Sequence, residues 1–169
     1  MSRPEPRVRP RPTPTEWLRR LRPLVIIEAY SEQKTSALLR RLAFFVGRAR
    51  QSSNPTLIVD LCNALERFDM SLFLFVQFYP RAQVRKIRRR VRKLSRLSRH
   101  VHEHDVALAF LRHARQRPGG QFSAHRRKLL ALYNHLSQQR KLTLDALREY
   151  IRKFSRREWS KRWRVRLGA

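Results

Sequence analysis

Residues 61–79 read LCNALERFDMSLFLFVQFY, and this stretch decides the fold. Its apolar side chains recur at spacings of four and three, at Leu61, Leu65, Phe68, Leu72, Phe75 and Tyr79. That period places them on one continuous face of an α-helix, which must be buried against other helices. Pro80 follows and is predicted to end the helix, because proline lacks the backbone N–H that a helix requires.

Similar apolar stripes on both sides of this helix predict an all-α protein. Toward the N-terminus we expect a short turn beginning at Thr15, a break at Pro23 and a long helix over residues 24–50. Toward the C-terminus the stripes predict one helix over residues 81–99 and another over residues 105–116, with Asp105 as its N-cap. Two further helices are expected, one beginning after an N-cap at Ser123 and one after an N-cap at Thr143. Amphipathic helices joined by short connections favour an antiparallel bundle of about six helices, which would occupy residues 15–157.

Both ends of the chain differ from this middle part. Residues 1–14 alternate Arg with Pro and contain almost nothing apolar, which predicts a disordered basic arm. Residues 158–169 form a basic tail in which Trp159 and Trp163 are four positions apart, on one face of a helical turn. Two interpretations of these tryptophans stay open. They contact a ligand, by stacking on bases or lying on anionic lipid, or they complete the core.

The net charge indicates a negatively charged partner. The 169 residues include 40 Lys plus Arg but only 12 Asp plus Glu, which gives a formal charge of +28. Residues 81–99 hold 10 of these cations and no acid. Like charges three or four positions apart on a helix repel by roughly a few tenths of a kcal/mol per pair, and a bound phosphate polymer would offset that cost. The alternative is a solvated face whose cations pair with acids elsewhere, but the acids are too few to pair all the bases.

Residues 58–75 read IVDLCNALERFDMSLFLF, and residues 91–108 read VRKLSRLSRHVHEHDVAL. These segments resemble the consecutive patterns VHxMRVxLRRLRxxLxxF and LKxLxxxLGxxRDLDVLL of the CHAD domain, a family of helical bundles associated with inorganic polyphosphate. The apolar positions match well, Arg67 falls on a family arginine, and Arg92 falls on the family's lysine. The departures are that Val59 stands at the family's histidine and that Cys62, Glu66 and Asp69 stand at three of its arginines.

The resemblance implies a shortened CHAD-like bundle whose phosphate ligands lie mainly on residues 81–99. In that segment we expect the polyanion to be bound by Arg85, Arg88, Arg89, Arg92, Lys93, Arg96 and Arg99. We expect further contributions from Arg67, Arg126, Arg127 and Lys128, and from Arg40 and Arg41. Arginine suits this role because its planar fork can bond two phosphate oxygens at once.

The sequence shows no pattern typical of catalysis or metal binding. Residues 100–105 read HVHEHD, but the spacing matches no zinc signature, and adjacent positions on a helix do not face the same way. We interpret this run as a helix junction with partly exposed histidines. Cys62 lies on the buried side of its helix and is expected to be structural, while Asp60, Glu66 and Asp69 are expected to offset nearby arginines.

The expected function is therefore binding, without enzymatic activity, metal or other cofactor. The first hypothesis is a CHAD-like module that binds inorganic polyphosphate. The alternative is an RNA-binding structural protein of a ribosome or other ribonucleoprotein, and an enzyme acting on a phosphate substrate is a weaker third hypothesis. One cysteine and the lack of a bilayer-spanning apolar stretch favour a cytoplasmic location, on a polyphosphate granule or in a ribonucleoprotein. The sequence does not reveal the oligomeric state.

Overall fold

The computed structural model describes residues 14–116, 126–155 and 159–168, and every regular element among them is helical. The expected disordered arm, apart from Pro14, and the predicted Ser123 cap lie outside the described residues. The elements are α1 Pro14–Ala49, α2 Pro55–Leu74, the 3-10 helix η1 Val76–Phe78, α3 Arg81–Gln116, α4 Arg126–Phe154 and α5 Trp159–Leu167. The all-α fold class is thus confirmed for the described part of the chain.

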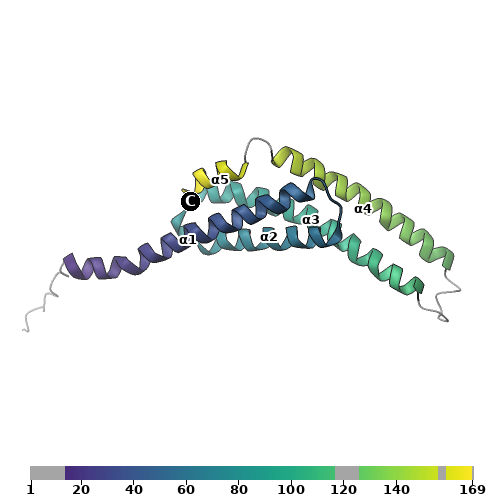
Figure 1. Ribbon diagram of the computed structural model, residues 1–169, viewed down its shortest axis with the longest axis horizontal. Coiled ribbons are helices and arrows are strands. Elements are labelled where there is room, and N and C mark those ends of the chain that lie inside the picture. Colours follow the sequence, from purple (N-terminus) through teal and green to yellow (C-terminus); the bar gives the residue numbers. More distant parts are fainter. Residues whose placement is uncertain (1–13, 117–125, 156–158, 169) are drawn as a thin grey trace, which may run out of the picture.

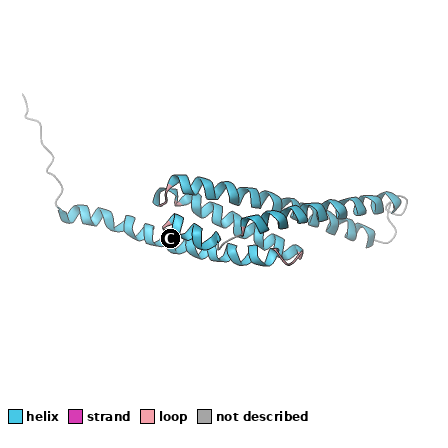
Figure 2. Cartoon of the chain, turned by 90° about the horizontal axis from the view of Figure 1, so that it is seen from above, coloured by secondary structure: helices cyan, strands magenta, loops and turns pink. Residues whose placement is uncertain are grey.

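The molecule is elongated, and its consecutive long helices turn back on one another (Figure 1). α1 packs on α2, α2 on α3, and α3 on α4. α4 returns along α3 from one far end of the molecule, and α5 contacts both α1 and α3 (Figure 1 and Figure 2). The described residues contain five α-helices rather than the six expected, because α3 and α4 each replace two predicted helices and the predicted tail forms the helix α5.

α2 confirms the apolar pattern from which the fold was predicted. Asn54 caps the helix, and its side-chain oxygen accepts a backbone N–H of the first turn at 3.0 Å. The stripe is buried, apart from one half-buried phenylalanine. The helix ends at Leu74, earlier than the predicted stop at Pro80, and η1 follows it. That turn carries the buried Tyr79 to α1, where its hydroxyl donates to the Ser31 carbonyl at 2.9 Å.

Three predicted helix boundaries are wrong. α1 continues through Pro23, α3 covers residues that were assigned to two helices, and α4 runs through Thr143. The described side chains that follow Pro23, as far as Tyr30, are exposed. Asp105 is not an N-cap, because it lies inside α3 and is only 6% exposed. Thr143 is not one either, because its hydroxyl donates to the Gln139 carbonyl one turn earlier, at 2.8 Å.

α3 presents one unbroken seam to the other helices. As far as Leu108 its buried residues alternate spacings of three and four, at Val84, Ile87, Val91, Leu94, Ser98, Val101, Asp105 and Leu108, and the buried Leu111 and Ala114 follow at spacings of three. This period of 3.5 is typical of a coiled-coil seam, which keeps one face of a long helix toward its neighbours. The two polar members are both bonded, since Ser98 donates to the Leu94 carbonyl at 3.0 Å and Asp105 accepts from Arg140 of α4 at 2.5 Å.

One guanidinium joins three parts of the fold. Arg140 of α4 bonds Asp105 of α3 and also donates to the carbonyl of Ser53, in the connection between α1 and α2, at 2.8 Å. Both charged side chains are largely shielded from solvent, with 19% of Arg140 and 6% of Asp105 exposed. Arg140 therefore fixes where α4 leaves the body of the molecule.

The C-terminal tail completes the core. Trp163 is 2% exposed, Trp159 is also buried, and the Phe154 ring packs against both, with centroid distances of 5.2 and 4.7 Å. On its other side, Trp163 stacks on Phe68 of α2 at 6.0 Å. Of the two interpretations left open by the sequence, the core interpretation is confirmed, because both rings are buried.

Candidate functional site

A groove lined by cations runs along the first half of α3. It has a volume of about 720 Å³ and is lined by Arg85, Arg88, Arg89, Arg90, Arg92, Lys93, Arg96 and Tyr150. We call it the basic groove. None of the described residues that line it is acidic, and Tyr150 of α4 is the one that carries no positive charge.

The basic groove follows from the period of α3. Because the seam uses every third or fourth position, the positions between its members are left for solvent. Four arginines at these positions follow one another at spacings of four, three and four, so they share a face of the helix. All four are exposed, and they are Arg85, Arg89, Arg92 and Arg96.

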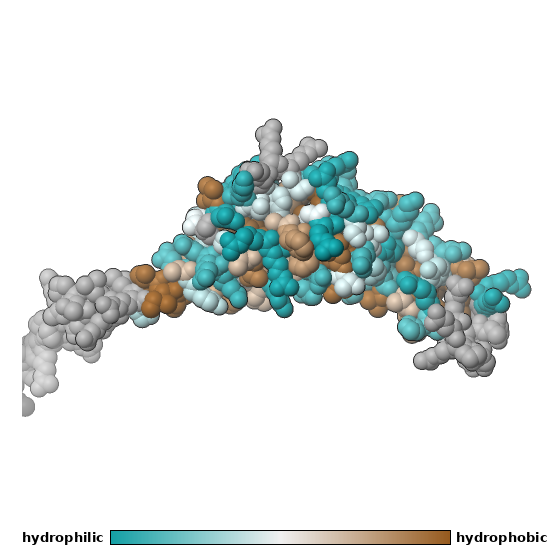
Figure 3. Space-filling model, in the orientation of Figure 1, coloured by the Kyte–Doolittle hydropathy of each residue, from teal (hydrophilic) through white to brown (hydrophobic). Residues whose placement is uncertain are grey.

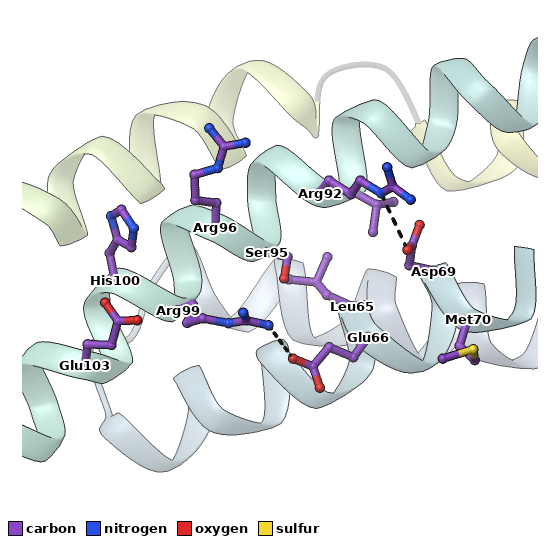
Figure 4. Close-up of a pocket in the computed structure, with 11 residues that line it drawn as sticks. Leu65, Glu66, Asp69, Met70, Arg92, Ser95, Arg96, Arg99, His100 and Glu103 are labelled. Atoms are coloured by element: carbon purple, nitrogen blue, oxygen red, sulfur yellow. Dashed lines mark hydrogen bonds and ion pairs between the residues drawn. The ribbon is translucent and has the colours of Figure 1, made fainter. Parts of the chain in front are cut away.

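Three of the predicted phosphate ligands are paired with acids of α2. Arg88 donates to both carboxylate oxygens of Asp69, at 2.7 and 2.9 Å, and this hydrogen bonding raises the pKa of Arg88. Nε of Arg92 lies 3.7 Å from the same carboxylate, and Arg99 donates to Glu66 at 2.9 Å (Figure 4). The prediction that Glu66 and Asp69 offset nearby arginines is confirmed. These three cations therefore fit the alternative interpretation of the sequence, in which cations on a solvated helix face pair with acids elsewhere in the chain.

The other cations of the basic groove have no acidic partner in the described part of the chain. Among the described residues, Arg85, Arg89, Arg90 and Arg96 make no ion pair. Figure 4 shows Arg96 pointing toward α4, away from the acids of α2. Lys93 lies over the Tyr150 ring, 5.1 Å from its centroid. We call these five residues the unpaired cations.

Tyr150 forms an aromatic wall of the basic groove. It is half-buried, its hydroxyl donates weakly to the Arg90 carbonyl at 3.4 Å, and burial raises its pKa. Its ring attracts the Lys93 ammonium through a cation–π interaction. Tyr150 therefore connects α4 to α3 and holds one of the unpaired cations in place.

The cationic surface continues onto α5. A smaller cavity of about 180 Å³ is lined by Lys86, Ile87, Arg89, Arg90, Trp163 and Arg166. Arg89 and Arg90 line both cavities, so the two cavities adjoin at these residues. Sequence reasoning missed Lys86, Arg90, Tyr150 and Arg166. The cationic run of α3 already contained Lys86 and Arg90, whereas Tyr150 and Arg166 become neighbours of α3 only through tertiary packing.

The remaining predicted ligands lie elsewhere. Arg67 lines a different, mainly apolar cavity between α1 and α2. Arg126, Arg127 and Lys128 are exposed at the start of α4, beside the end of α3 rather than beside the basic groove. At 1.5 Å of rise per residue, that end of α3 lies about 30 Å from Arg96, the cation of the basic groove nearest to it along the helix. Arg40 and Arg41 of α1, which were also expected to contribute, are exposed, and the Arg41 guanidinium lies 5.8 Å from the Phe45 ring centroid.

The residues considered for catalysis or metal binding are dispersed. In the described part of the chain, no group of three or more His, Cys, Asp or Glu is placed to hold a metal ion. The run at residues 100–105 is not a helix junction, because α3 continues through it, and His104 Nδ1 lies 2.6 Å from the His100 carbonyl oxygen. Burial raises the pKa of Cys62 to about 11, so its thiol is protonated at neutral pH. Asp60 pairs with no described cation.

Comparison with known proteins finds no matching family model, no similar curated protein and no similar solved structure. None of the described helices is both long enough and apolar enough to cross a membrane.

Proposed function

We propose that this protein binds a linear phosphate polymer in the basic groove, without enzymatic activity. The observation that carries the proposal is the set of unpaired cations, Arg85, Arg89, Arg90, Lys93 and Arg96, which share one groove whose described lining contains no acid. Their mutual repulsion costs stability in the free protein, and a polyanion would remove that cost. Each neutralised phosphate would also release condensed counterions.

The shape of the basic groove suits a chain rather than a single phosphate. From Arg85 to Arg96 the groove extends about 16 Å along α3 at 1.5 Å per residue, and the adjoining cavity adds Arg166 from α5. Four of the five unpaired cations are arginines, which can each bond two phosphate oxygens. We infer recognition of charge and spacing along the polymer.

Inorganic polyphosphate is the ligand we favour. The tryptophans that would suit stacking on bases are buried in the core, and the ring of Tyr150 is covered by Lys93. The resemblance to the CHAD domain supports the same ligand, in a shortened, antiparallel CHAD-like bundle. A cytoplasmic location on polyphosphate granules would accompany this function.

Single-stranded RNA is the second candidate. Tyr150 supports it, because an aromatic ring beside arginines is a stacking platform for bases once Lys93 moves aside. Such a protein would be a structural component of a ribonucleoprotein.

The test is a competition between long-chain polyphosphate and single-stranded RNA for the purified, nuclease-treated protein, titrated from low to high salt. We expect polyphosphate to stay bound at physiological salt while RNA is released. Retention of RNA against excess polyphosphate would contradict the proposal and favour the ribonucleoprotein function. Loss of both ligands at physiological salt would contradict both functions.

A further inference from the structure

The N-terminal part of α1 projects beyond the other helices (Figure 1). The described side chains from Pro23 to Tyr30 are all exposed, and the first buried side chain described in α1 is Ser31. Four successive residues of this projection, from Leu24 to Ile27, are apolar. Successive residues point to different sides of a helix, so apolar side chains surround the projection. A helix with this character is normally buried in protein or in lipid.

The apolar surface continues from this projection onto the body of the molecule. A cavity of about 390 Å³ begins at Tyr30 and is lined by residues of α1 and α2. Its apolar walls on α2 are open to solvent, because Met70 and Leu74 are exposed. Figure 3 shows hydrophobic residues gathered where the projection leaves the body. We call the projection from Leu24 to Tyr30 and this cavity together the apolar end.

The apolar end is large enough to mark an interaction site. Five of its apolar side chains are between 42% and 68% exposed, and they are Ile26, Ile27, Tyr30, Met70 and Leu74. At these exposures each presents on the order of 100 Å², which gives about 500 Å² in total. Apolar patches of this size on a protein surface are often functional.

Positive charge borders this apolar surface. Lys34 and Arg67 line the cavity, both are exposed, and none of the described residues that line it is acidic. The exposed acids of α1 nearest to it, Glu28 and Glu32, each lie two positions from Tyr30. Two positions are about 200° around a helix of 3.6 residues per turn. Both glutamates therefore belong to the side of α1 that faces away from the cavity.

The neighbouring sequence keeps the apolar end positive. Glu66 and Asp69 of α2 are on the side of α3, where both pair with arginines. Asp60 lies seven residues before Arg67, or about 10 Å farther from the projection. Ahead of Pro23, the sequence of α1 holds one acid, Glu16, and three arginines, which are Arg19, Arg20 and Arg22.

We propose that the apolar end docks on the surface of an anionic lipid bilayer. Its apolar side chains would enter the boundary between headgroups and acyl chains, while Lys34 and Arg67 would meet the lipid phosphates. The net charge of +28 favours such a surface, whereas it opposes contact with a second copy of the chain. The inference does not depend on the proposed polyphosphate function, because it uses none of the unpaired cations.

The test must isolate the apolar contribution, since a charge of +28 alone brings the protein to any anionic surface at low salt. The test variant combines Ile26→Gln with Leu74→Gln. The matched control combines Phe110→Gln with Leu132→Gln, two exposed apolar residues of the hairpin that α3 and α4 form at the opposite end of the molecule (Figure 1). All three proteins carry the same net charge, and circular dichroism shows whether each is folded.

The assay is co-sedimentation with vesicles of phosphatidylcholine that contain about 30% phosphatidylglycerol, at physiological salt and in about 0.5 M NaCl. We expect the unaltered protein and the control to bind at both salt concentrations, because salt does not screen apolar insertion. The test variant should bind about tenfold more weakly at physiological salt and be released in about 0.5 M NaCl. Vesicles of phosphatidylcholine alone should retain little of any of the three proteins.

A label on the apolar end reports insertion directly. An environment-sensitive dye can be attached to an Ile26→Cys variant, because the pKa of about 11 makes Cys62 slow to react. We expect the emission of this dye to shift to the blue when anionic vesicles are added. The same dye on a Phe110→Cys variant should not shift.

Four results would each overturn the proposal. They are an unaltered protein that does not bind anionic vesicles, equal binding of the three folded proteins at both salt concentrations, equally tight binding to phosphatidylcholine alone, and an unshifted dye at residue 26. Equal binding of the three would indicate adsorption by charge alone. The test variant should bind polyphosphate like the unaltered protein, so failure of the vesicle test leaves the proposed function standing.

Discussion

Replacing Arg85, Arg89 and Arg96 together with Gln is expected to weaken polyphosphate binding and to flatten its dependence on salt. These three belong to the five unpaired cations, so the variant keeps two of them. For a single-stranded polyanion, log K falls with log salt at a slope of about −0.7 per neutralised phosphate. If each unpaired cation neutralises one phosphate, the slope is about −3.5 for the unaltered protein and about −1.4 for the variant. The same relation gives a loss of about 50-fold in affinity at 0.15 M salt.

The assay is fluorescence anisotropy of a labelled polyphosphate no longer than the basic groove, at several salt concentrations. A matched control replaces Arg126, Arg127 and Lys128 with Gln, which removes the same charge about 30 Å farther along the hairpin. We expect this control to keep most of the affinity and nearly the whole slope. Equal losses in the two triple variants would refute a localised site and indicate that the ligand responds only to total charge. An unchanged slope in the groove variant would exclude the basic groove as the site.

Three single substitutions test other features of the structure. Arg140→Met should lower the free energy of unfolding by about 3–5 kcal/mol in urea titration, because it leaves the buried Asp105 carboxylate without its partner; a loss below about 1 kcal/mol would contradict this role. Asp69→Asn should release Arg88 and Arg92 and, if each then neutralises one more phosphate, raise polyphosphate affinity about 14-fold at 0.15 M salt with a steeper salt slope, whereas weaker binding would show that Asp69 organises the site. The Cys62 thiol, with its pKa of about 11, should be alkylated at pH 8 far more slowly in the folded than in the urea-unfolded protein, and equal rates would place it in solvent.

The helical fold could be predicted from the sequence because its apolar period is strong and local. The stripe of α2 is buried as expected, and the cationic positions of α3 are left for solvent once the seam takes the apolar ones. The breaks could not be predicted from local signals. Asp105 has the side chain of a good N-cap, but Arg140, a residue distant in sequence, neutralises it inside a continuous helix.

The candidate site could be predicted only in part. The run of cations on α3 located the basic groove, and the scarcity of acids showed that most cations would stay unpaired. Which cations are paired depends on the register between α2 and α3, which places Asp69 beside Arg88 and Glu66 beside Arg99. That register is a tertiary property, so the sequence could not show that Arg88, Arg92 and Arg99 have acidic partners.

The acids of α2 help to explain how α3 can remain in contact with its neighbours despite its charge. Asp69 and Glu66 face α3, where they hold Arg88 and Arg99 on the side of α2. Exposed ion pairs contribute little, but the Arg88 pair is bidentate and partly buried, so it resists the repulsion along α3 where that helix packs. Arg96 points the other way, toward α4, and pairs with none of the described carboxylates. α3 can therefore both pack on α2 and present a site for a polyanion, because carboxylates compensate its charge on the side of α2, whereas its charge in the basic groove is uncompensated. A polyanion should then stabilise the fold as well as bind to it, because its phosphates supply negative charge in the basic groove, as the carboxylates of α2 do on the other side of α3.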